Sequence, residues 1–187
     1  MTTPSAAEAE LAGWLEDSYQ RSYRTAYLLL RNRADAQEAV QEAFLRAWRF
    51  RASLDAGSNI APWLYRVVVN SCCSKLRQER PRRDRHTEDG DLASLASTAT
   101  SPEDVVWHAE VAREVVHALA ELPLHLRVAV VLRYYGDLSE REIAIAIGRR
   151  PGTVKSRLHE ARRRLAERPG LRALALDPDT ATVEAVR

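Results

Sequence analysis

Apolar residues recur at every third or fourth position through most of the chain, which is the spacing of amphipathic helices. No segment shows the alternation of apolar and polar residues that is typical of a half-buried strand, and no internal repeat is present. We therefore predict an all-α protein. The predicted helices cover residues 8–31, 35–50 and 62–80, and further helices begin near residues 102, 123, 139 and 153.

Two polar stretches interrupt this helical pattern. Residues 51–61 are rich in turn-forming side chains, so we expect a loop there. Residues 81–101 are polar, small and mixed in charge, which predicts a flexible linker. The expected organisation is two small helical domains, over residues 8–80 and 102–168, followed by a tail of unassigned role at 169–187.

The strongest local motif begins at Ser139, a natural N-cap, with Glu142 three residues later to complete a capping box. Gly148 ends the short helix that follows, because glycine adopts a left-handed backbone at the least cost. We expect a second helix to begin at Thr153. A short helix, a turn containing glycine and a second helix are typical of a helix-turn-helix.

The second helix of this motif is rich in cations and small hydrogen-bonding side chains. Such a helix suits the major groove, so the motif predicts sequence-specific binding of duplex DNA. The alternative is an ordinary helical hairpin with a solvated charged face. The exposed positions are expected to be Lys155, Ser156, Arg157, His159, Arg162 and Arg163.

One face of the predicted helix over residues 62–80 combines an indole, guanidinium groups and an amide. These groups can stack on unpaired bases and hydrogen-bond to their edges. Alternatively, Trp63 only packs at the start of the helix and the other side chains are solvated. A basic block at residues 75–85 favours the nucleic-acid interpretation, since clustered cations can hold phosphates. The face comprises Trp63, Arg66, Asn70, Ser74 and Arg77.

The predicted helix over residues 35–50 has an acidic outer face. Acidic residues near a helix start are ordinary partners of the helix dipole, so a solvated face is one interpretation. The other is a docking face for a basic partner, which an exposed Leu45 among the charges favours. The outward positions are expected to be Asp35, Glu38, Gln41, Glu42, Leu45, Arg46 and Arg49.

Composition narrows the function classes. The formal net charge is only +2, but cations gather at residues 75–85 and 149–168, which favours a polyanionic partner.

Cys72 and Cys73 are the only cysteines, and their adjacency gives no disulfide framework or metal-ligand spacing. No catalytic residue set, metal site or cofactor motif is found. A polar start without a signal peptide, and the lack of an apolar run long enough to span a bilayer, predict a cytoplasmic protein without membrane insertion.

Four segments, in this order and at these separations, resemble a bacterial RNA polymerase sigma factor of the extracytoplasmic-function (ECF) class. They are Asp35–Trp48, Trp63–Asn70, Glu121–Pro123 and Leu138–Leu165. The resemblance implies a non-enzymatic, dissociable subunit of RNA polymerase that directs it to promoters and starts transcription. It implies two helical domains, sigma region 2 and sigma region 4, with no further domain between them.

The resemblance also implies partners and residue roles. Core RNA polymerase would bind through the clamp helices of its largest subunit and the flap of its second-largest subunit, and an anti-sigma factor is a further candidate partner. The face meeting the clamp helices would comprise Asp35, Glu38, Gln41, Glu42 and Leu45. The melted −10 element would meet Asp55, Ser58, Asn59, Trp63, Arg66, Asn70, Lys75 and Arg77. The duplex −35 element would meet Arg149, Arg150, Thr153, Lys155, Ser156, Arg157, His159 and Arg163.

Two other classes of protein remain as alternatives. A helix-turn-helix regulator of the response-regulator output type would bind duplex DNA as a dimer without polymerase. Such a protein usually carries a domain with a parallel sheet, whereas the first half of this chain has no strand pattern. A protein-interaction module would use residues 35–48 for docking and yield no promoter-dependent product. A transcription assay with core RNA polymerase distinguishes the sigma factor from these two alternatives, because only a sigma factor should direct a specific transcript.

Overall fold

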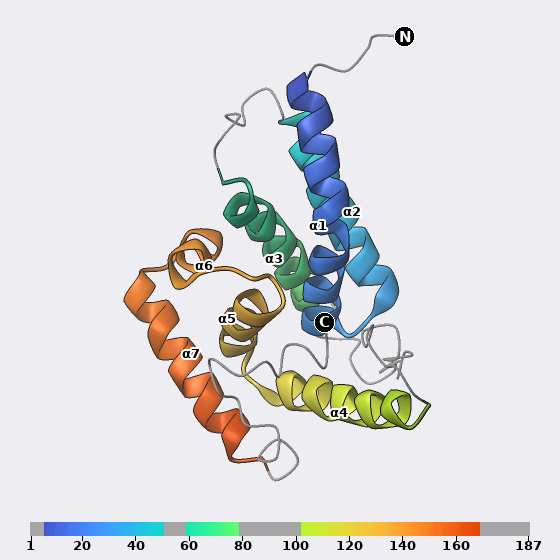
Figure 1. Ribbon diagram of the computed structural model, residues 1–187. Coiled ribbons are helices and arrows are strands. Elements are labelled where there is room, and N and C mark those ends of the chain that lie inside the picture. Colours follow the sequence, from blue (N-terminus) through green and yellow to red (C-terminus); the bar gives the residue numbers. More distant parts are fainter. Residues whose placement is uncertain (1–5, 51–58, 79–101, 169–187) are drawn as a thin grey trace.

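The computed structural model describes residues 6–50, 59–78 and 102–168, and within these ranges every regular element is an α-helix. The expected linker, the tail, Asp55 and Ser58 lie outside the described residues. Figure 1 shows α1 to α3 as one bundle, with α4 to α7 packed beside it. The helices are α1 (Ala6–Leu30), α2 (Arg33–Arg49), α3 (Ala61–Gln78), α4 (Pro102–Glu121), α5 (Leu124–Tyr134), α6 (Glu140–Ile147) and α7 (Pro151–Ala166).

The break between α1 and α2 is set by two residues. Arg31 has a left-handed backbone (φ 57°), which ends α1. Asn32 then caps α2, because its Oδ1 accepts a hydrogen bond of 3.0 Å from the backbone N–H of Asp35. Helix α2 therefore begins at Arg33, two residues before the predicted start at Asp35.

The inner face of α3, opposite its polar face, comprises Leu64, Val67, Val68, Cys72 and Leu76, which are all buried. Two further α3 residues, Tyr65 and Val69, are buried as well. The additional burial follows from the position of α3 between the first bundle and the second half of the chain.

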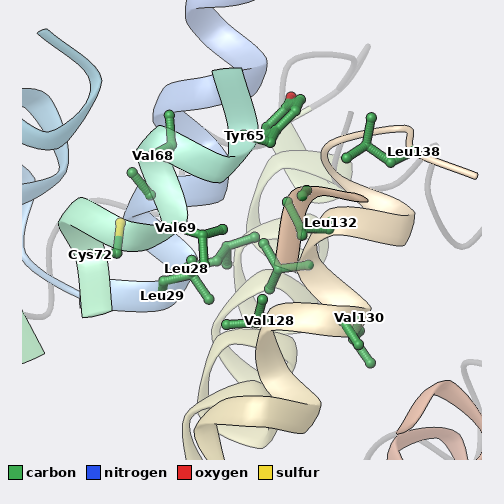
Figure 2. Close-up of a cluster of buried hydrophobic side chains, with 14 of the residues drawn as sticks. Leu28, Leu29, Tyr65, Val68, Val69, Cys72, Val128, Val130, Leu132 and Leu138 are labelled. Carbon is green, nitrogen blue, oxygen red and sulfur yellow. The ribbon is translucent and has the colours of Figure 1, made fainter. Parts of the chain in front are cut away.

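The two halves share one continuous apolar core. Figure 2 shows Leu28 and Leu29 of α1 and Val69 of α3 gathered against Val128 and Leu132 of α5. All five side chains are buried. Helix α6 also lies alongside α3 (Figure 1). The two helical blocks thus pack against each other in this structure.

A buried guanidinium adds a polar connection between the same halves. Arg127 of α5 donates to the carbonyl oxygen of Leu29 at 3.2 Å, at the end of α1. It also donates to the carbonyl oxygens of Ala120 at 2.6 Å and Leu122 at 3.2 Å. Because carbonyls at helix ends lack intrahelical partners, this cation satisfies groups that would otherwise be buried without hydrogen bonds.

Candidate nucleic-acid interface

The start of the helix-turn-helix has the predicted capping box. The backbone N–H of Glu142 donates to the Oγ of Ser139 at 3.3 Å, and the Ser139 N–H donates to the Glu142 carboxylate at 2.8 Å. These bonds from Ser139 hold the pKa of Glu142 below its ordinary value. The buried residues Ile143, Ala144 and Ala146 fix α6 against its neighbours.

The turn between α6 and α7 matches the prediction at one end and corrects it at the other. Gly148 has a left-handed backbone (φ 61°) and ends α6, as predicted. Helix α7, however, begins at Pro151 rather than at Thr153, with Arg150 in the N-cap position. Proline suits the first position of a helix because its φ is already helical and its missing N–H needs no partner there.

Helix α7 buries one face and presents the other to solvent. Val154, Leu158, Ala161 and Leu165 form the buried face. The candidate −35 contacts Lys155, Ser156, His159 and Arg163 are exposed together with Arg149 and Arg150, while Thr153 and Arg157 are half-buried. Burial, together with the nearby cation of Arg149, lowers the pKa of Arg157.

Some of these exposed groups have partners within the helix. The guanidinium of Arg163 pairs with Glu160 at 2.9 Å and with Glu167 at 2.7 Å. The hydrogen bond from Arg163 lowers the pKa of Glu160 to about 2. Ser156 donates from its Oγ to the carbonyl oxygen of Gly152 at 3.0 Å. The Lys155 side chain has no ion pair with the described residues.

On α3, the predicted polar face reaches the surface. Arg66, Asn70 and Arg77 are exposed, whereas Trp63 and Ser74 are half-buried. The indole of Trp63 packs partly against the core, as one of the two interpretations expects, and its stacking on bases stays a prediction. Arg77 donates to the Cys73 carbonyl oxygen at 3.2 Å, which keeps it along the helix.

Lys75 occupies a different position from the rest of the candidate −10 residues. Its ammonium group lies 3.2 Å from the carboxylate of Asp35 and 2.8 Å from that of Glu38, both on α2. Burial opposes the charged form, but hydrogen bonds with Glu38 and Asp35 prevail and raise the pKa of Lys75. The side chain links α3 to the acidic face.

The acidic face predicted for α2 is exposed only in part, because Asp35 and Glu42 are half-buried. Glu38, Gln41 and Leu45 are exposed, and Leu45 keeps 57% of its surface accessible. Glu42 is half-buried, because its Oε2 accepts a 2.7 Å hydrogen bond from the hydroxyl of Ser71 on α3. That hydrogen bond lowers the pKa of Glu42.

Two apolar side chains outside the predicted residues are exposed as well. Trp48 is 38% exposed and Phe50 is 55% exposed, near the end of α2. The prediction omitted both residues, although a surface that leaves large apolar groups accessible is typical of an interaction site. The helical spacing Leu45, Trp48 was a usable signal in the sequence, because these positions are three apart on one helix.

Asn59 connects the start of α3 to α6. Its Oδ1 accepts a 3.1 Å hydrogen bond from the backbone N–H of Ala61 at the start of α3. Its Nδ2 donates to the Oε1 of Glu142 on α6. The residue expected beside the melted −10 element is thus bonded to the first helix of the helix-turn-helix.

Other kinds of site receive no support from the described residues. Within them, no group of three or more histidine, cysteine or acidic side chains could hold a metal ion. None of the described helices is both long and apolar enough to cross a membrane.

Comparison with known proteins identifies two family segments. The family model for sigma-70 region 2 matches residues 14–82, and that for sigma-70 region 4 matches residues 112–165. The ECF RNA polymerase sigma factor SigW of Bacillus subtilis is 30% identical over 149 residues, covering 76% of this chain and 80% of the relative. ECF RNA polymerase sigma factor SigM of Mycobacterium tuberculosis is 34% identical over 148 residues, covering 79% and 71%.

Solved structures show the same fold. CnrH in complex with the cytosolic domain of CnrY matches with a TM-score of 0.62 and 20% identity, covering 91% of this chain and 89% of that chain. The sigma factor RpoE of Bartonella quintana, in complex with the anti-sigma factor NepR, matches with a TM-score of 0.60 and 23% identity, covering 88% and 98%. The two matched segments, the curated relatives and the helical architecture together show that this chain belongs to the ECF family of RNA polymerase sigma factors, which are non-enzymatic transcription initiation factors.

Proposed function

We propose that this sigma factor reads duplex and melted promoter DNA with two separate faces while an acidic and apolar face docks on core polymerase. The observation that carries the proposal is the coexistence of the two DNA faces in one chain. Helix α7, the second helix of the helix-turn-helix, exposes Lys155, Ser156 and His159, and α3 exposes Arg66 and Asn70.

The chemistry of the two faces suits two states of DNA. A helix in the major groove can distinguish every base pair, so the −35 element stays double-stranded. At −10, opening the duplex costs free energy, and capture of unstacked bases by the α3 face offsets part of that cost. Opening is driven by binding energy, and the polymerase performs the phosphoryl chemistry.

The docking face is proposed to centre on Leu45. Its 57% exposed side chain can enter an apolar contact, and Trp48, three positions further along the same helix, can extend that contact. Glu38 and Gln41 lie beside it and can meet a basic partner surface such as the clamp helices. Asp35 and Glu42 are held by Lys75 and Ser71, so their proposed role is to orient this face.

Lys75 is accordingly reassigned from direct −10 contact to positioning. A cation that bonds both Asp35 and Glu38 fixes α3 relative to α2. The −10 face would therefore be held at a set angle to the polymerase-docking face. Arg66 and Asn70 remain the proposed direct contacts on α3, with Trp63 as the stacking group.

Two further partnerships and the location follow as proposals. Both similar structures are complexes, one of them with an anti-sigma factor, so an anti-sigma factor is a proposed partner here. The exposed cations of residues 149–163 are proposed to contact the −35 duplex, and the same domain to contact the polymerase flap. Because a sigma factor acts with RNA polymerase on chromosomal promoters, we propose that this protein acts in the cytoplasm.

The proposal is tested by reconstituted transcription. Purified chain is added to core RNA polymerase with a pool of genomic promoter fragments, and run-off products are mapped. Specific start sites that depend on the chain are expected, and Leu45→Glu should abolish them and co-elution with core polymerase. The control Gln78→Glu makes a comparable charge change at an exposed position at the end of α3. Duplex binding without any polymerase-dependent product would instead support the response-regulator alternative.

A further inference from the structure

Four arginines surround one pocket where α3, α6 and the start of α7 meet. The pocket has a volume of about 790 Å³, and its lining includes Arg66 from α3, Arg141 from α6, and Arg149 and Arg150 from the turn. None of its lining residues is a carboxylate. Within the described part of the chain, none of these four guanidinium groups is paired with an acid. Such a concentration of like charge is relieved when an anion enters.

The remaining wall of the pocket also suits an anion with an apolar or aromatic attachment. Helix α7 starts at this pocket, and its N-cap residue Arg150 makes no side-chain capping bond. Because this 16-residue helix begins at the pocket, the positive end of its dipole lies at the cavity. Ile145, which is 59% exposed, adds an apolar surface at the edge.

Arg66 completes the pocket only while the two halves are packed together. Arg66 belongs to α3, whereas the other three arginines belong to the helix-turn-helix. A Cβ placed on Gly148 would lie only 3.8 Å from Nη2 of Arg66, so the guanidinium sits directly beside the turn. The Asn59 to Glu142 hydrogen bond joins the same two elements. A ligand that bridges Arg66 and Arg149 would stabilise this packing, because it binds only the packed form.

We propose that the pocket binds an oligophosphate, meaning a small anion with several linked phosphate groups, either an inorganic chain or the phosphates of a nucleotide. One guanidinium group can donate hydrogen bonds to two phosphate oxygens at once, and linked phosphates concentrate several negative charges within a few atoms. An acidic peptide would need about four residues, roughly 13 Å of extended chain, for the same charge. The pocket volume falls within the range of about 300–1,000 Å³ that is common for small-ligand sites.

Occupancy of this site would oppose promoter binding. Arg66, Arg149 and Arg150 are also candidate DNA contacts, so one set of cations cannot serve both anions at once. This consequence rests on the proposed function, whereas oligophosphate binding itself does not. A substitution of Arg141 distinguishes oligophosphate binding from promoter binding, because Arg141 lines the pocket and lies outside the proposed DNA contacts.

The test is calorimetric titration of the full chain with inorganic tripolyphosphate and, separately, with ATP, both without divalent cations and at constant ionic strength. Arg141→Gln and Arg66→Gln should each weaken tripolyphosphate binding about tenfold or more, since each removes a charge-assisted hydrogen bond. The matched control is Arg113→Gln on α4, an exposed arginine outside the pocket, which should change affinity less than about twofold. Tighter binding of ATP than of tripolyphosphate would indicate that the nucleotide base contacts Ile145. Equal binding of the two ligands would indicate that the site recognises the phosphate chain alone.

Three results would overturn the proposal. The first is equal weakening by the Arg113 control, which would mean non-specific attraction to a basic surface. The second is tighter binding of a tetraglutamate peptide than of tripolyphosphate, which would assign the pocket to a protein partner. The third is an Arg141→Gln variant that weakens −35 duplex binding as strongly as tripolyphosphate binding. Helical circular dichroism verifies that each variant folds, and run-off transcription reports on the proposed function independently.

Discussion

The ring of Tyr65 on α3 packs against Gly136, the residue at which the chain leaves α5. A Cβ added to Gly136 would lie 3.3 Å from the Cζ of Tyr65 and 2.9 Å from the carbonyl oxygen of Leu132. Tyr65 belongs to the region 2 match and Gly136 to the region 4 match. Burial raises the pKa of Tyr65. The absence of a side chain at Gly136 therefore allows the two halves to approach closely.

Gly136→Ala should lower the free energy of unfolding by about 1–3 kcal/mol, the usual cost of overpacking a tight contact. The Leu132 oxygen is a backbone atom and cannot rotate away, so Tyr65 or α5 must move. Urea denaturation followed by circular dichroism measures the change. Gly13→Ala is the control, because no atom lies within 4 Å of a Cβ there, and it should raise stability by about 0.5–1 kcal/mol. Equal effects of the two substitutions would contradict the packing role of Gly136.

Ser139→Ala should destabilise the protein by about 1 kcal/mol at neutral pH, because the first turn of α6 loses its cap. The effect should depend on pH. The pKa of Glu142 is lower in the folded state than its ordinary value of 4.5, so its contribution is present above that value and is lost as the pH falls through the lowered one. The stability difference between parent and variant should shrink from pH 7 to pH 3 in urea titrations. A difference that stays constant over this range would show that the Glu142 carboxylate adds nothing to the cap.

Asn70→Ala should reduce formation of the open promoter complex while leaving −35 duplex affinity unchanged. Its amide is exposed on α3 and can hydrogen-bond to an unstacked base. Permanganate footprinting of the −10 region measures the opening. Gln78→Ala, another exposed amide on the same helix, serves as the control. If the Asn70→Ala and parent footprints were equal, the exposed face of α3 would be scaffold only.

Lys155→Ala and Arg157→Ala should each weaken binding of the −35 duplex, by ~1–3 kcal/mol if the contact is bidentate to guanine. Lys155 is fully available on the outer face of α7, whereas Arg157 is half-buried. Fluorescence anisotropy with the isolated duplex gives the affinities. Arg164→Ala is the matched control, since Arg164 is an exposed arginine on the same helix that lies outside the proposed −35 contacts. Unchanged affinity in both test variants would remove these residues from the interface.

Cys72 should resist alkylation in the native protein, because burial raises the pKa of its thiol to about 12 and blocks access. Cys73 is half-buried, so it should react first, although burial raises its pKa too. Peptide mass spectrometry after timed exposure to iodoacetamide distinguishes the two sites. Labelling of Cys72 is expected only on addition of denaturant, and modification at equal rates would contradict the burial of Cys72.

Local features of the fold followed well from the sequence. The capping box at Ser139 and the left-handed Gly148 are set by residues close together in the chain, so local chemistry determined them. The exposed positions Lys155, Ser156 and His159 of α7 followed from helical spacing for the same reason. Helix α7 begins two residues before the expected Thr153, because Pro151 occupies the first helical position, which its fixed φ suits.

Contacts between the two halves could not be predicted from local patterns. Tyr65 and Val69 lie outside the inner stripe of α3, and their burial depends on α5, about sixty residues away. Lys75 belongs to a basic block, which favoured DNA, yet two acids on α2 hold it. In both cases the deciding partner comes from a different helix, and periodicity within one helix carries no information about it.

The packing of α6 on α3 limits the reach of the protein. Promoter elements centred at −35 and −10 are separated by about 25 base pairs, or roughly 85 Å of duplex. A compact chain of this length has a radius of gyration of only roughly 16 Å. Simultaneous occupation of both elements therefore requires the halves to separate, with loss of the Asn59 to Glu142 bond. The free energy needed to separate the halves weakens promoter binding. A free sigma subunit should therefore bind genomic sites far more weakly than one whose halves are already separated on the polymerase.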